Sequence, residues 1–171
     1  MSHPTPPRYA PARPFPPYAF LPGRDPHPTG DPRGHSYSSE REAPAVYLPA
    51  ERWRENEDYL FGCDLYNFGY LWEAHEAWEG LWHRARHDSD QSELLQGLIQ
   101  CAAACLKIPM DQPGGRARLA EAGTARLERV ARARGGSHMG LELFGLVRDF
   151  RAFAALDAPD LDARPRLELD A

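Results

Sequence analysis

This sequence of 171 residues lacks the features that mark membrane and secreted proteins. It has no run that approaches the roughly 18 consecutive apolar residues of a membrane-spanning helix. Its N-terminus has no basic segment followed by an apolar one, which is the pattern of a secretory signal. We therefore expect a cytoplasmic protein that does not enter a membrane.

Cysteine is scarce, and its three positions exclude a disulfide framework. The number is odd, and Cys63, Cys101 and Cys105 form no C-x-x-C pair. Reduced thiols in an intracellular protein are the simplest interpretation. Cys101 and Cys105 lie four positions apart on one helix face, where we expect buried thiols in preference to a metal or redox site.

A strong charge of one sign is absent too. The formal net charge is −5, which gives no overall attraction to nucleic acid or to anionic lipid. Arginines are concentrated in residues 116–134, but Glu121 and Glu128 lie among them, so we favour a solvated helix face over an RNA or phosphate site. The sequence also has no glycine-rich phosphate loop and no G-x-S-x-G nucleophile motif.

Proline divides the chain, because 12 of its 17 prolines lie in residues 1–44. Proline prevents regular helix, and this segment has too few apolar residues to offset the entropy of folding. We predict a disordered proline-rich arm over residues 1–44, more plausibly passive than partner-binding. A helical domain over residues 45–157 and a flexible tail over residues 158–171 complete the predicted organisation.

The central part of the chain predicts an all-α fold, a compact antiparallel bundle of about five helices. Apolar residues recur three and four positions apart, and strand-like alternation is almost absent. Asn67 and Gly69 indicate one helix end, and Gly135 and Gly136 indicate another. The helices are expected at residues 50–66, 70–87, 91–108, 116–134 and 141–156. The third is apolar on nearly every face, which indicates a central position.

A histidine and several carboxylates lie in the most aromatic part of the sequence, residues 67–82. Helical residues advance by about 100° each, which aligns His75 with Glu79 and places Glu76 beside them, while Glu73 points away. Tryptophans in the same segment suggest that this face is buried. Histidine and glutamate four residues apart can both reach one metal ion, and this donor set suits zinc, manganese or iron.

The third predicted helix offers a polar stripe that would face this group. Gln96, Gln100 and Lys107 are expected to orient a substrate or a water molecule next to the metal. Lys107, the single lysine among 20 basic residues, should need Glu76 or Glu79 as its partner. Two other interpretations stay open: a buried polar layer that fixes helix register, or an exposed face without a site.

Two motifs together resemble a known family. The stretch from Asn67 to Trp82 contains H-x-x-x-E-x-x-W, and L-L-Q-G-L-I-Q follows at residues 94–100. Over residues 59–130 the chain is similar to the bacterial and archaeal domain-of-unknown-function family 309. The resemblance implies a compact all-helical protein and carries a suggested metal-binding role to His75, Glu79 and, more loosely, Glu76. No reaction is established for the family.

The leading hypothesis is therefore a divalent-metal site, with hydrolysis by a metal-activated water as its chemistry. His75 and Glu79 would be ligands, and Glu76 a ligand or the general base. The alternative is a metal-free interaction module in which the polar layer is structural and the arm or the arginine face recruits a protein or RNA. A small molecule or a protein is the partner expected, since the charge argues against nucleic acid.

Overall fold

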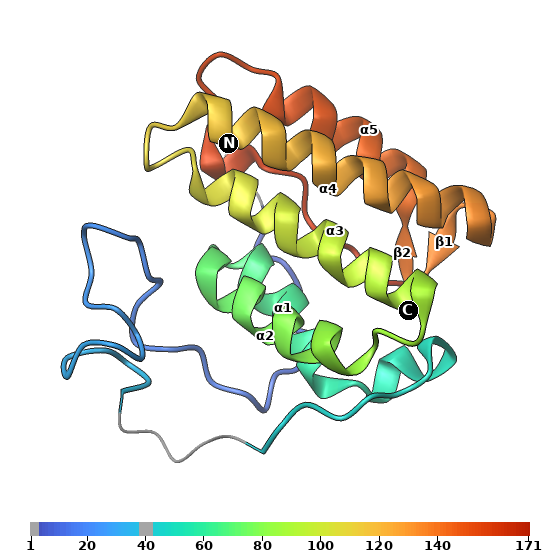
Figure 1. Ribbon diagram of the computed structural model, residues 1–171, viewed down its shortest axis with the longest axis horizontal. Coiled ribbons are helices and arrows are strands. Elements are labelled where there is room, and N and C mark those ends of the chain that lie inside the picture. The colour runs from blue at the N-terminus through green and yellow to red at the C-terminus, as the bar shows by residue number, and fades with distance from the viewer. Residues whose placement is uncertain (1–3, 38–42) are drawn as a thin grey trace.

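In a computed structural model, which describes residues 4–37 and 43–171, helices account for most of the regular structure. The elements are η1 (Ala50–Glu55), α1 (Glu57–Asn67), α2 (Leu71–Arg84), α3 (Ser89–Leu106), α4 (Pro113–Arg134), β1 (Ser137–His138), β2 (Leu141–Glu142), α5 (Leu143–Ala154) and η2 (Leu161–Ala163). Helix α3 packs between α2 and α4, while α1 lies against α2 and α5 against α4 (Figure 1). The predicted helical bundle is thus confirmed, with five α-helices among the residues that the structure describes.

Two predicted helices begin differently because local caps intervene. The first is split at Asn56, whose side chain accepts a hydrogen bond from the Tyr59 backbone N–H and so starts α1 separately from η1. The fifth is preceded by an antiparallel pair, β1 and β2, that the sequence did not predict. Met139 and Gly140, both with positive φ, form the turn of this hairpin, and Glu142 then caps α5.

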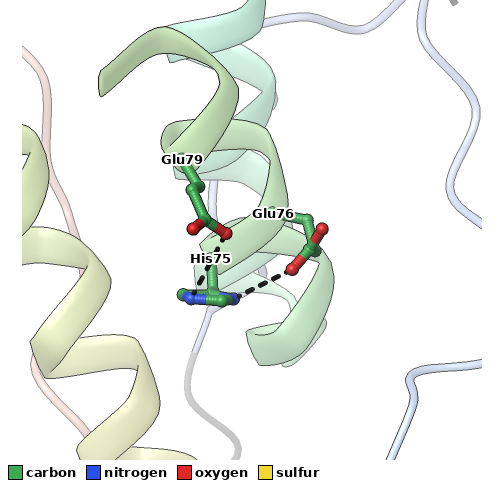
Figure 2. Close-up of side chains that lie close together, drawn as sticks. All are labelled: His75, Glu76 and Glu79. Carbon is green, nitrogen blue, oxygen red and sulfur yellow. Dashed lines mark ion pairs between the residues drawn. The ribbon is translucent and has the colours of Figure 1, made fainter. Parts of the chain in front are cut away.

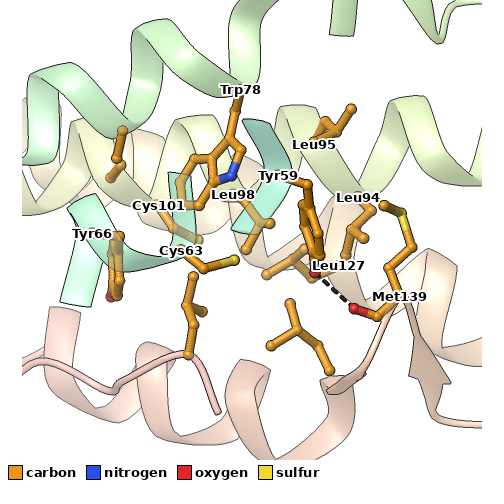
Figure 3. Packing of buried hydrophobic residues seen from close by; sticks show 14 of the residues in the cluster. Tyr59, Cys63, Tyr66, Trp78, Leu94, Leu95, Leu98, Cys101, Leu127 and Met139 are labelled. Carbon is orange, nitrogen blue, oxygen red and sulfur yellow. Dashed lines mark hydrogen bonds between the residues drawn. The ribbon is translucent and has the colours of Figure 1, made fainter. Parts of the chain in front are cut away.

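The core lies where the α-helices meet, and α5 contributes to it as well as α1, α2, α3 and α4 (Figure 3). Tyr59, Trp78, Leu94 and Leu127 are fully buried there. The Tyr59 hydroxyl donates to the Met139 carbonyl over 2.9 Å, which satisfies the one polar group of that ring. These side chains fix α2 against α3 and therefore decide which face of α2 is left for solvent.

The N-terminal segment has no helix or strand among residues 4–37, as its prolines predict, but it is not a free arm. Ala10 and Phe20 are each 6% exposed, so parts of the segment are buried against the bundle. Asp64 of α1 accepts hydrogen bonds from the Arg8 side chain and from the Tyr9 and Ala10 backbone N–H groups. The prediction of disorder is therefore not upheld for these residues, because long-range hydrogen bonds dock them.

The C-terminal segment is held in the same way, in place of the flexible tail predicted from its composition. Asn67 and the backbone of Leu167 exchange two hydrogen bonds, of 2.9 and 2.8 Å. Arg164 is 7% exposed and donates to the Tyr66 and Asn67 carbonyls, which lie at the end of α1. Within the described residues, no helix combines the length and apolar character needed to cross a membrane.

Candidate functional site

Helix α2 has two faces of different chemistry. Leu71, Ala74, Trp78 and Leu81, spaced three and four apart, are at most 3% exposed and pack into the core. Only one tryptophan of α2, Trp78, belongs to this fully buried set. The residues between these positions turn away from the core, and they include the histidine and glutamates singled out in the sequence.

His75, Glu76 and Glu79 form a cluster on this second face. His75 Nδ1 lies 3.4 Å from Glu76 Oε1, and His75 Nε2 lies 3.8 Å from Glu79 Oε2 (Figure 2). One potential ligand atom from each residue falls within 4.8 Å of the others. The imidazole ring thus has a carboxylate at each of its two nitrogens.

The cluster is half-exposed, which corrects the prediction of a buried interhelical layer. The side chains of His75, Glu76 and Glu79 are 31%, 47% and 40% exposed. The prediction failed because Trp72 and Trp82, taken as signs of burial, lie at the flanks of α2 and are only half-buried. Water therefore has access to the three potential ligands.

The electrostatic environment favours a charged imidazole. The Glu76 carboxylate raises the pKa of His75 above its ordinary value, partial burial opposes this, and Glu79 adds a smaller increase. Because a metal ion binds neutral imidazole, it would compete with the proton for a nitrogen of the His75 ring.

The polar stripe of α3 is not joined to this cluster. Among the described residues, no hydrogen bond connects Gln96, Gln100 or Lys107 to the glutamates or histidine of α2. The Gln100 side chain accepts from Arg126 over 3.1 Å. Lys107 follows the last turn of α3, and its side chain donates to Gln112 Oε1 over 2.9 Å. The prediction that Lys107 pairs with Glu76 or Glu79 is therefore wrong. Gln96 is half-buried, and its proposed role stays a prediction.

The arginine face of α4 is largely paired within the protein, which fits the predicted solvated face. Arg126 and Arg129 both contact Glu93, and Arg134 contacts Asp90 over 2.6 Å. Arg132 and Arg151 both contact Glu128. A phosphate backbone would have to displace these carboxylates.

Glu73, which helix geometry predicts to point away from His75 and Glu79, is the buried carboxylate of α2. Its side chain is 5% exposed, and its Oε1 accepts from the Phe20 backbone N–H over 2.8 Å and lies 2.9 Å from His35 Nε2. It borders a cavity of about 270 Å³ between the N-terminal segment and α2, which Glu76 also lines. Helical periodicity could not reveal this site, because its partners come from the N-terminal segment.

In the comparison with known proteins, only part of the helical bundle finds a match. No curated protein and no solved structure matches the chain. Residues 59–119 match a family model, and this stretch covers α1, α2, α3 and the start of α4 but not the N-terminal segment or α5. The match confirms the resemblance over residues 59–119, which are similar to the family described as domain of unknown function (DUF309).

Proposed function

We propose that the protein binds a divalent metal ion through His75 and Glu79, with Glu76 beside them. The observation that carries the proposal is the approach of one nitrogen and two carboxylate oxygens to within 4.8 Å of one another. They come from a single helix, so an ion that gathers them restricts side-chain rotamers but needs no further ordering of the backbone.

The arrangement of the ring divides the roles between the two glutamates. A bound ion takes one nitrogen of an imidazole, and the other nitrogen then carries a proton that needs an acceptor. Glu79 approaches Nε2 and Glu76 approaches Nδ1, so ligation through Nε2 and Glu79 leaves Glu76 to accept the Nδ1 proton. This mixed nitrogen and oxygen donor set suits zinc, manganese or iron.

The exposure of the cluster favours a reactive over a structural role. Structural zinc sites are closed by four protein ligands, whereas catalytic sites keep a position for water. A bound ion would supply an activated water at neutral pH, the basis for the hydrolytic activity that we propose. Glu76, 47% exposed, is free to act as base on a water molecule when it is not holding the ring.

Metal analysis by mass spectrometry tests the proposal on protein purified without a nickel column and incubated with zinc, manganese or iron(II). We expect stoichiometric metal in the wild type and its loss in His75→Ala and in Glu79→Ala. His87→Ala is the matched control, since His87 is exposed beyond the end of α2 and should leave the metal content unchanged. Equal metal in all four proteins, or none in the wild type, would exclude the site.

The metal-free interaction module remains the second candidate. It predicts that His75→Ala only destabilises the protein, while removal of residues 1–44 abolishes the capture of a partner. This candidate used the arginine face of α4 to recruit a partner. Because those arginines are largely paired with carboxylates of the protein, the structure supports it less than the sequence does. A wild-type protein without metal affinity would favour it.

A further inference from the structure

The cavity between the N-terminal segment and α2 contains a hydrogen-bonded chain of three side chains. Ser36 Oγ lies 2.7 Å from His35 Nδ1, and His35 Nε2 lies 2.9 Å from Glu73 Oε1. All three residues line the cavity of about 270 Å³. The order of hydroxyl, imidazole and carboxylate is that of a serine nucleophile with its base and the carboxylate that orients the base.

The hydrogen bonds fix the tautomer of the imidazole. Glu73 Oε1 also accepts the Phe20 backbone N–H, so this oxygen serves as an acceptor and His35 Nε2 must supply the proton between them. In this tautomer the lone pair of the His35 ring is on Nδ1, so in the hydrogen bond between the two side chains the Ser36 hydroxyl is the donor. The proton of Ser36 is therefore directed at the base that would remove it.

The chain around these groups holds them in place. The His35 backbone N–H donates to the Tyr18 hydroxyl over 3.1 Å, and the two rings are 4.7 Å apart. The Ser36 backbone N–H donates to the Pro28 carbonyl over 2.9 Å. The side chains of His35 and Glu73 are 4% and 5% exposed, so the imidazole and carboxylate are almost removed from bulk water. Such positioning is what a nucleophile and its base require.

We propose that Ser36 is a nucleophile that cleaves small esters, with His35 as its general base and Glu73 as the residue that positions His35. This activity is separate from the proposed metal site on the other side of Glu76. The half-exposed carboxylate of Glu76 lines the same cavity and disfavours an anionic substrate. The size of the cavity and its Trp72 wall suit a short uncharged or cationic ester.

The reaction balances without any further cofactor. Ser36 Oγ attacks the ester carbonyl carbon as its proton passes to His35 Nδ1, and Glu73 stabilises the resulting imidazolium through Nε2–H. The bond to the leaving alkoxide breaks as His35 returns that proton to it, which leaves an acyl group on Ser36. Water then attacks the acyl carbon, gives a proton to His35 and releases the acid, and the serine recovers its proton.

Acetylation by p-nitrophenyl acetate in EDTA tests the proposal on the full chain, since the chelator removes any metal-assisted hydrolysis. We expect one acetyl group on Ser36, located by peptide fragmentation that separates it from Ser38 and Ser39. Ser36→Ala should lower the acetylation rate at least about a hundredfold. Ser137→Ala, at an exposed serine of β1, should have no effect. Acetyl groups on other serines only, or an unchanged rate in Ser36→Ala, would overturn the assignment.

A second variant separates positioning from folding. Glu73→Gln keeps the shape of the side chain but removes the charge that stabilises the imidazolium. It should slow acetylation at saturating ester at least about tenfold while the half-saturating concentration stays the same. Glu121→Gln, on the exposed face of α4, is the control. If Glu73→Gln is folded by circular dichroism and reacts at the wild-type rate, the role given to Glu73 is wrong.

Discussion

Replacement of Asp64 by asparagine should release the N-terminal segment from the bundle. Asp64 is completely buried in α1, and its two oxygens accept from Arg8 Nε over 2.9 Å, Tyr9 N over 2.7 Å and Ala10 N over 2.9 Å. Asparagine keeps the shape but loses the charge and offers one accepting oxygen instead of two. Its amide group would then face a donor of the N-terminal segment, and that contact is repulsive.

The expected loss of stability is about 3 kcal/mol. Removal of one of the two charges of a buried ion pair costs about 3–5 kcal/mol, because the remaining charge is left buried without a partner. Arg8 can escape part of this cost, since its side chain is 25% exposed and regains water when the segment undocks. Asp58→Asn is the control. The side chains of its ion pair, Arg13 and Asp58, are 26% and 37% exposed, so the pair should contribute less than about 1 kcal/mol.

Urea denaturation measures the free energy of unfolding, and amide hydrogen exchange follows the segment itself. In the wild type the Tyr9 and Ala10 amides should be protected, and in Asp64→Asn they should exchange at nearly the rate of an unfolded peptide. Equal stability of the two proteins would refute the reasoning. So would rapid exchange of both amides in the wild type, because a segment that is not docked needs no acceptor.

Three further outcomes follow from the packing. Gly62→Ala should destabilise the protein by about 2 kcal/mol or more in urea denaturation, since a Cβ there would lie 2.2 Å from Trp78 Nε1; an unchanged midpoint would contradict this close approach. Arg164→Lys should cost about 2 kcal/mol in the same assay, because one ammonium cannot replace the planar guanidinium on the Tyr66 and Asn67 carbonyls. Burial, with Arg134 as a smaller cause, lowers the pKa of His138, so the unfolded chain binds this proton more readily. Stability should therefore fall as the pH drops below about 6.5, and thermal melts of His138→Gln should show a weaker fall; parallel curves would exclude the linkage.

Much of the fold could be predicted because helices are specified locally. The spacing of Leu71, Ala74, Trp78 and Leu81 marks the buried face of α2, and glycine marks helix ends such as Gly135, whose φ is +70°. The alignment of His75 with Glu79 also follows from helix geometry. The exposure of that face could not be predicted, because a half-buried tryptophan and a core tryptophan look the same in a sequence.

The amino-acid order alone established a helical bundle, its approximate helices, and the neighbourhood of His75, Glu76 and Glu79, since each depends on residues close in the chain. Long-range packing determined the rest: which carboxylates are buried and what they contact. Asp64 meets Ala10 across 54 positions, and Glu73 meets His35 across 38. Such pairings depend on how the N-terminal segment folds back over α1 and α2, and a periodic pattern within one helix contains no record of it.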